Sequence, residues 1–173
     1  NSSIQGQPGS LAALLEKHET ALLAQWMDEQ LASVATRRDL MNEAELRDQS
    51  RQFLAQVRTA VRTDNFTDLS RPEWAAVRDL LTDVTRSRAS QGFTPSETAV
   101  FVFSLRSPLL ALMQREGGKE LSGTLDGAGK LIDKLGLYTF EEYQKTREAI
   151  INRQQQDMLE LSKQVEGLAS NAG

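Results

Sequence analysis

The sequence predicts an all-α protein, a helical bundle with a long C-terminal linker helix that projects from it. Two observations predict this class. Apolar residues recur at helical spacing along most of the 173 residues, and strand-like alternation is almost absent. The last predicted helix would also span about 45 Å, whereas a compact domain of this length has a radius of gyration of about 14–15 Å.

The first predicted helix covers residues 11–35, after a polar lead at 1–10 that we expect to be flexible. Its inward stripe is Leu11, Leu15, Leu22 and Trp26. The second helix follows Asn42, a favourable N-cap residue, with Glu45 at the third helical position. Its inward residues are Leu46, Phe53, Val57 and Val61.

The third and fourth helices have clear start signals. Pro72 opens the third helix and Gly92 ends it. Its inward stripe is Trp74, Val77, Leu81 and Val84. The run Thr94-Pro95-Ser96-Glu97 forms a capping box for a fourth helix that is apolar on nearly every side, so we expect it to be central and covered all round. Pro108 lies inside this helix and predicts a kink near the preceding turn.

The fifth predicted helix follows a break at Glu116-Gly117-Gly118 and ends at Gly136, a C-cap. Its inward residues are Leu121, Leu125, Ala128, Ile132 and Leu135. Three glycines within it, at 123, 127 and 129, weaken the helix and predict close approach of a neighbouring backbone.

The final predicted helix begins with a second capping box at Thr139, and Phe140 and Tyr143 are expected to dock its first turns on the core. Beyond residue 147 the apolar pattern repeats every seven residues, which predicts a coiled-coil dimer. We call the residues of this repeat the seam: Ile151, Gln154, Met158, Leu161, Val165 and Leu168. Gln154 is expected to lower stability and fix the register. The alternative is an amphipathic helix that lies back on its own bundle.

The predicted organisation is therefore a flexible lead at 1–10, a helical sensor domain at 11–138, a linker helix at 139–168 and a tail at 169–173. A net charge of −4 and an isoelectric point near 5.1 argue against nucleic acid or anionic lipid as partners. No apolar run of about 18–20 residues and no signal-peptide pattern is visible. We therefore expect a cytoplasmic protein with no membrane contact, and the absence of cysteine is compatible with that compartment.

Catalytic motifs are absent from the sequence, so we expect neither an enzyme nor a cofactor or metal site. His18, the single histidine, lies on the inward stripe of the first helix. It is a candidate haem or metal ligand or a proton-responsive switch, and more simply a histidine at the edge of the core with one hydrogen bond. Haem is disfavoured because no histidine occurs in the second half of the chain.

Two arginines at apolar positions, Arg88 and Arg106, are candidates for a ligand pocket. A buried guanidinium needs a partner, since an unpaired buried charge is costly. The simpler expectation is a salt bridge to a carboxylate of another helix, or hydrogen bonds to the carbonyls at a helix C-terminus. The alternative is a pocket that holds an anionic small-molecule effector.

Several stretches together resemble a known family. They are TRSRASQGFTPSETAVFVFSLRSPLL, LLAQWMDEQL, LRDQSRQFLAQV and YQKTREAIINRQQQDMLELS, and the resemblance extends from about residue 11 to residue 162. The chain resembles the N-terminal domain of RsbR/RsbRD-type RsbT co-antagonists, which belong to the stressosome.

The resemblance implies an all-α, often dimeric sensor domain with a globin-like or related helical fold. This domain relays stress through its linker helix to a C-terminal STAS domain. In that family the STAS domain is phosphorylated by an RsbT-like kinase and assembles with RsbS-like STAS proteins. The sequence ends where the STAS domain is expected to begin, so no phosphoacceptor is assigned. Two alternatives stay open: a domain that binds a small molecule or haem, and a scaffold that dimerises without sensing a ligand.

Overall fold

The structure is a computed structural model that describes residues 10–33, 39–63 and 65–172. Every regular element in these residues is helical, which confirms the all-α class. The elements are α1 (Leu11–Ser33), α2 (Glu43–Val61), the 3₁₀ turn η2 (Pro72–Trp74), α3 (Ala75–Gln91), α4 (Pro95–Phe103), α5 (Arg106–Glu116), α6 (Gly118–Ser122) and α7 (Leu125–Asn171). The expected lead at 1–10, Ser10 apart, and the end of the first helix at residue 35 lie outside the described residues.

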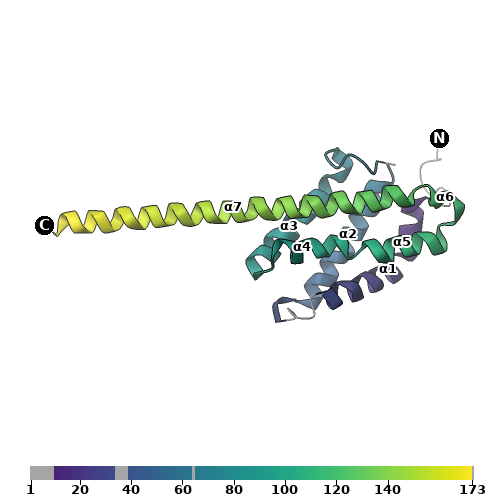
Figure 1. The fold of residues 1–173 in the computed structure, drawn as a ribbon, viewed down its shortest axis with the longest axis horizontal. Helices are drawn as coiled ribbons and strands as arrows, with labels where there is room; N and C mark the ends of the chain where they lie inside the picture. Colours follow the sequence, from purple (N-terminus) through teal and green to yellow (C-terminus); the bar gives the residue numbers. More distant parts are fainter. Residues whose placement is uncertain (1–9, 34–38, 64, 173) are drawn as a thin grey trace.

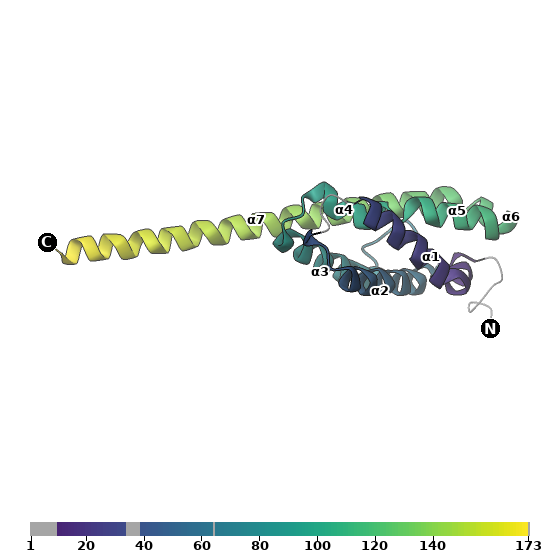
Figure 2. The ribbon, with the colours of Figure 1, turned by 90° about the horizontal axis from the view of Figure 1, so that it is seen from below.

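The helices form two layers with α1 across one side. Helices α4 and α5 lie beside the first half of α7, and α2 and α3 form the second layer (Figure 1). Seen at right angles, α1 crosses obliquely from one layer to the other (Figure 2). It contacts α2, α4 and α5, so it closes the bundle on the side away from α7.

Three aromatic rings occupy the centre of the bundle. Trp26 of α1, Phe53 of α2 and Phe101 of α4 contact one another with ring centroids 5.1–5.5 Å apart. All three side chains are buried. Because each ring comes from a different helix, this cluster joins both layers through α1.

The predicted helix starts in the first two thirds of the chain are confirmed. The side chain of Asn42 accepts a hydrogen bond from the backbone N–H of Glu45 at 3.1 Å. Thr94 and Glu97 form the reciprocal capping box at 3.1 and 2.9 Å. Gly92 ends α3 with a φ of 94°, in the left-handed region that glycine adopts readily.

The apolar segment that carries Pro108 is two helices rather than one. It breaks at residues 104 and 105, and Pro108 lies in the first turn of α5, where a missing N–H costs little. The predicted kink is confirmed. The expectation that this segment is covered on all sides is wrong, because Phe103 at the end of α4 is 43% exposed.

The segment Pro95–Glu116 has the length and composition of a membrane span, with a mean hydropathy of 1.2, contrary to the expectation from sequence. Half of that window is buried inside the domain. Core helices of globular domains have the same character, since they are apolar on most sides.

The last helix begins at Leu125, so the predicted C-cap at Gly136 and the predicted start at Thr139 are both wrong. Gly136 is buried inside α7, and a Cβ there would overlap the ring of Phe103. Gly136 therefore allows the ring of Phe103 to pack closely on α7 and does not end a helix. Thr139 is buried and its hydroxyl donates to the carbonyl of Leu135 at 2.9 Å, as a threonine within a helix does.

The other glycines were expected to allow close approach of a neighbouring backbone, and none of the three does so. A Cβ at Gly123 or Gly127 would meet nothing within 4 Å, so the expectation fails there. At Gly129 the neighbour is the side chain of Arg106, at 3.4 Å from the Cβ position.

Candidate functional site

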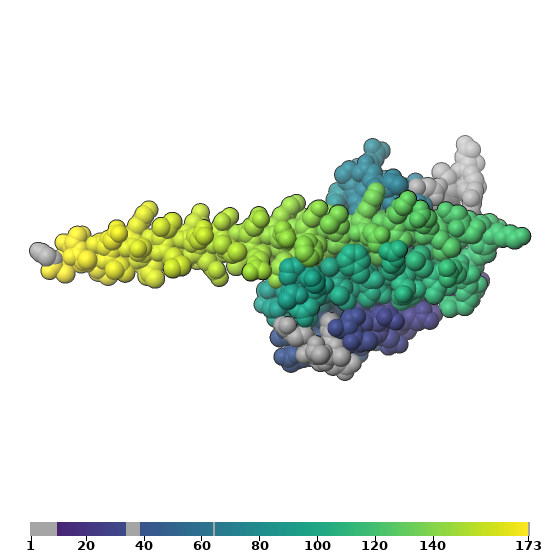
Figure 3. Space-filling view, in the orientation of Figure 1, coloured from purple at the N-terminus to yellow at the C-terminus, as the bar shows by residue number. Residues whose placement is uncertain are grey.

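The second half of α7 stands free of the domain, and we call residues 147–171 the stem. At about 1.5 Å per residue, the whole helix is roughly 70 Å long. Every residue from Arg147 to Ala172 is exposed, and the space-filling view shows the stem as an isolated rod beyond the bundle (Figure 3). In this chain the stem does not lie back on its own bundle.

Five of the seven large exposed apolar side chains of the stem belong to the seam, and the other two are Ile150 and Leu159. Ile151 is 41% exposed, Met158 71% and Leu168 70%. Leu161 and Val165 are exposed to a similar degree, and Gln154 is exposed with them. The seam is therefore an apolar stripe that nothing within the chain covers among the residues that the structure describes.

The root of the stem is fastened to the turn between α3 and α4. Tyr143, the last buried residue of α7, donates its hydroxyl proton to the carbonyl of Phe93 at 2.7 Å. Glu142 accepts a hydrogen bond from the hydroxyl of Thr82 at 3.3 Å and forms an ion pair with Lys145 at 3.3 Å. The expected docking through Tyr143 is confirmed, while Phe140 is only half-buried.

An open groove of about 380 Å³ lies between α3 and α7 at this root, and we call it the root groove. Its lining residues are Arg86, Glu142, Lys145, Thr146, Ala149, Ile150 and Arg153. Three cations face one carboxylate, so the groove has a positive balance in a chain of net charge −4. Sequence reasoning missed it because Arg86 lies about 60 residues before the others, and only the fold brings them together.

Arg88, a predicted pocket residue, is 5% exposed and lies inside the bundle. Its guanidinium lies 5.4 Å from the ring centroid of Phe93 and 5.9 Å from that of Phe101, and it donates to Oε1 of Gln49 at 3.0 Å. Burial lowers the pKa of Arg88, and the carboxylate of Glu45 opposes this shift. Within the described residues Arg88 has no carboxylate within 4.0 Å, so it lacks the expected salt bridge.

Arg106, the second predicted pocket residue, lies on the surface. It forms an ion pair with Asp133 of α7 at 2.5 Å, and both side chains are about half exposed. Its position at the start of α5, after the helix break, turns it outward. The simpler expectation, a salt bridge to another helix, therefore describes Arg106.

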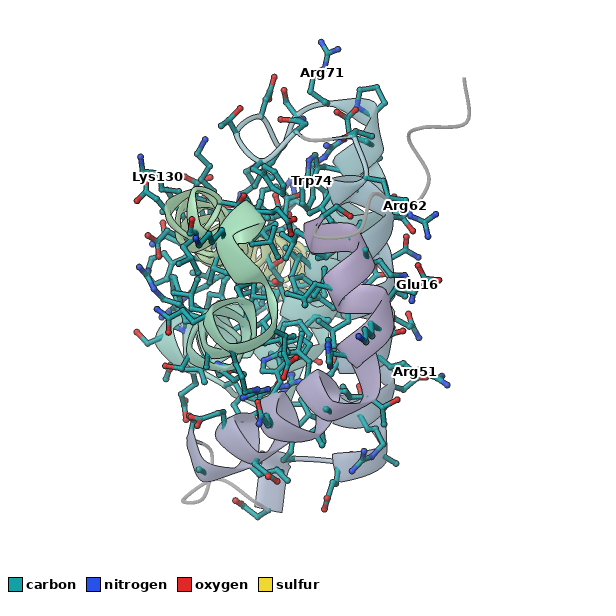
Figure 4. The ribbon with its side chains drawn as sticks, turned by 90° about the vertical axis from the view of Figure 1, so that its right-hand side faces the viewer. Glu16, Arg51, Arg62, Arg71, Trp74 and Lys130 are labelled. Carbon is teal, nitrogen blue, oxygen red and sulfur yellow. The ribbon has the colours of Figure 1, made fainter. Side chains whose placement is uncertain are left out.

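His18, the third candidate, is half-buried at a kink in α1, with φ −114° and ψ 17°. It is not among the lining residues of the root groove, and neither are Arg88 and Arg106. No group of three or more metal-ligating side chains occurs in the residues with described positions. The ion pairs near His18 join α1 to the C-terminal part of α2. Glu19 pairs with Arg58 at 2.7 Å, and Glu16 lies 4.0 Å from Arg62 (Figure 4 labels Glu16 and Arg62).

A second exposed apolar surface lies on the domain, and we call Phe103, Leu137 and Phe140 the domain patch. Leu137 is 56% exposed and Phe103 43% exposed. The ring of Phe103 lies against Gly136, next to Leu137 in the chain and one turn before Phe140. Sequence reasoning missed this patch, although the seven-residue repeat extended backwards from Ile151 would have reached Leu137.

These features define a class of protein: an all-α domain whose core helix continues into an exposed rod with an apolar stripe. A family profile, the RsbT co-antagonist protein rsbRD N-terminal domain, matches residues 20–158, and the chain belongs to that family. The family is a regulatory one associated with the stressosome and is not a known class of enzyme. Searches of curated proteins and of solved structures each return no match.

Proposed function

We propose that this chain is the non-enzymatic sensory domain of an RsbR-like stressosome protein of the cytoplasm. It dimerises through the stem and relays a stress signal along α7 to a STAS domain in sigma-factor regulation. Its partners are a second copy and, through the STAS domain, RsbS-like proteins and an RsbT-like kinase. Membership of the rsbRD N-terminal domain family supports this role.

The observation that carries the proposal is the continuity of α7. The same helix provides core residues such as Leu131 and Leu135 and, without interruption, the exposed seam. A helix that is packed at one end and free at the other transmits a displacement of the core to whatever follows it. Such a relay requires two arrangements whose balance the signal changes.

Dimerisation follows from the seam. An apolar stripe at seven-residue spacing loses contact with water when it packs on the same stripe of a second helix. A stem without a partner would keep Met158 and Leu168 largely in solvent. The alternative scaffold role uses the same dimer but transmits no signal.

Binding of an anionic small-molecule effector is a second candidate function. The root groove supports it, because Arg86, Lys145 and Arg153 surround an opening where α7 leaves the domain. Arg88, Arg106 and His18 remain candidates, although none of the three lines the root groove.

The relay is tested in the chain joined to its STAS domain by insertions after Gln155. One inserted residue rotates the following helix by about 100°, whereas seven inserted residues keep the seam in phase. We expect one residue to abolish stress-dependent phosphorylation of the STAS domain by the kinase and seven to preserve it. Equal responses would favour the scaffold role.

Dimerisation is tested by sedimentation equilibrium of the 173-residue chain. Met158→Asp places two carboxylates in the seam and should weaken the dimer at least tenfold. Leu159→Asp is the matched control, because Leu159 is 62% exposed but lies outside the seam. A monomeric wild-type chain at hundreds of micromolar would contradict the proposal.

A further inference from the structure

The seven-residue repeat of the seam continues backwards into the domain. Leu137 lies three heptads before Met158, and Phe140 lies three heptads before Leu161. Both residues therefore occupy the two seam positions of the same repeat. They belong to the part of α7 that packs on α3, α4 and α5.

The orientation of Leu137 leaves room for a partner. Helix geometry places it about 160° around α7 from Leu135, which is buried against the bundle. A second helix can therefore approach Leu137 without meeting the helices of its own domain. Phe103 borders the same surface from α4, since its ring lies against Gly136.

We infer that the dimer interface extends from the stem onto the domain, where the domain patch packs on the domain patch of a second copy in a parallel, in-register pair. This inference rests on the proposed dimer and adds to it the residues of a second contact. The partner is a second copy because a two-fold axis along the seam brings Leu137 opposite Leu137 and Phe140 opposite Phe140.

The length of the seam favours this extension. The stem alone supplies fewer than three heptads, whereas sustained coiled coils have at least about three to four. The domain patch adds another apolar layer and a second helix, α4, to the interface. It also covers two of the large apolar side chains that the chain leaves exposed, Phe103 and Leu137.

The flanking charges are compatible with parallel pairing. In a parallel pair each g position faces the e position of the next heptad in the other helix. Asp157 then faces Ser162 of the second copy, and Ile150 faces Gln155 of the second copy. Neither contact opposes like charges, so this pairing incurs no repulsion at these positions.

Two polar seam positions separate the domain patch from the stem. Gln144 and Arg147 occupy the two positions of the seven-residue repeat that lie between Phe140 and Ile151. Arg147 lies beside Glu148 of the second copy in this arrangement, which offsets the repulsion between the two arginines. Polar layers lower seam stability, so the domain patch and the stem are two contacts on one axis.

The experiment uses single cysteines in the 173-residue chain, which has none of its own. Leu137→Cys tests the domain patch, Met158→Cys tests the seam, and Leu159→Cys controls for random collision. Seam residues of a parallel pair have Cα atoms close enough for a disulfide. After mild oxidation, we expect most of the Leu137→Cys and Met158→Cys chains to run as dimers on non-reducing gels and few of the Leu159→Cys chains.

The outcomes separate this inference from the proposed function. Cross-linking at Met158→Cys without Leu137→Cys would overturn the extended interface and leave the stem dimer intact. Failure at both positions would overturn both proposals. Cross-linking at Leu137→Cys alone would refute a continuous seam.

A second measurement does not depend on oxidation. Leu137→Asp should weaken the dimer at least tenfold in sedimentation equilibrium, with unchanged helical circular dichroism because Leu137 is 56% exposed. Leu159→Asp is again the control. An unchanged dimer in Leu137→Asp would overturn the inference.

Discussion

The indole nitrogen of Trp26 lies 3.1 Å from the carbonyl oxygen of Phe101, so α1 supplies a donor in place of the backbone N–H of Leu105. At the break, the N–H of Leu105 bonds to Val102 instead of reaching back to Phe101. The same indole N–H lies 3.0 Å from the hydroxyl of Ser104. A residue about 75 positions away in the sequence therefore stabilises the junction between α4 and α5.

We expect Trp26→Phe to destabilise the domain by about 2 kcal/mol, because it removes a buried hydrogen bond and part of a buried ring. The carbonyl of Phe101 then keeps only the 3.3 Å hydrogen bond from the hydroxyl of Ser104. Trp74→Phe is the matched control. Trp74 is also fully buried, but its indole donates at 3.0 Å to Asn65 in a half-buried loop. Urea unfolding should show the smaller loss for Trp74→Phe, and an equal or larger loss would contradict this account of the break.

Gly136→Ala should destabilise the domain by about 1–3 kcal/mol, because the added Cβ overlaps the ring of Phe103. Gly127→Ala should stabilise it by up to about 1 kcal/mol, since that Cβ meets nothing within 4 Å and alanine favours a helix. Thermal unfolding of the two variants should shift in opposite directions. The double variant Gly136→Ala with Phe103→Ala should recover part of the loss, and no recovery would exclude this contact as the cause.

Gln154→Leu should strengthen the dimer, because it replaces a polar seam residue by an apolar one. Gln156→Leu is the control, since residue 156 is exposed and lies outside the seam. Dissociation constants from sedimentation equilibrium should fall for Gln154→Leu by at least threefold and stay within error for Gln156→Leu. A fall of the same size in both variants would mean that added apolar surface anywhere on the stem promotes association, and would contradict a specific role of residue 154.

Arg106→Met should cost less than about 1 kcal/mol, because its ion pair with Asp133 is about half exposed and solvent screens it. Arg58→Met should cost more, about 1–3 kcal/mol, because its pair with Glu19 at 2.7 Å is about three-quarters buried. Denaturant titration of both variants measures the difference. A larger loss of stability in Arg106→Met than in Arg58→Met would contradict this ranking of the two ion pairs by burial.

The fold class and most helix starts could be predicted from sequence because their causes are local. Thr94 and Glu97 meet within one turn, so a capping box can be recognised in four letters. Thr139 is part of a similar pattern and caps nothing, because Phe103 from α4 packs on Gly136 and keeps the helix continuous. The decisive contact joins residues more than 30 positions apart, beyond the reach of a local pattern.

The candidate site was less predictable for the same reason. The seam could be found from its seven-residue repeat, and its exposure follows from the length of α7. Arg106 was expected to be buried, yet the break before α5 turns it toward Asp133 on the surface. The root groove depends on Arg86 of α3 meeting Lys145 and Arg153 of α7, which only the packed bundle determines.

Tyr143 is the last residue of α7 that is buried against the domain, so a tilt of the free part of the helix pivots about it. From Tyr143 to Asn171 the helix runs about 42 Å without support from its own chain. A tilt of about 5° at Tyr143 therefore displaces Asn171 by roughly 4 Å. A rearrangement at the turn that holds Tyr143, too small to disturb the core, is amplified at the far end into a movement about as wide as a side chain.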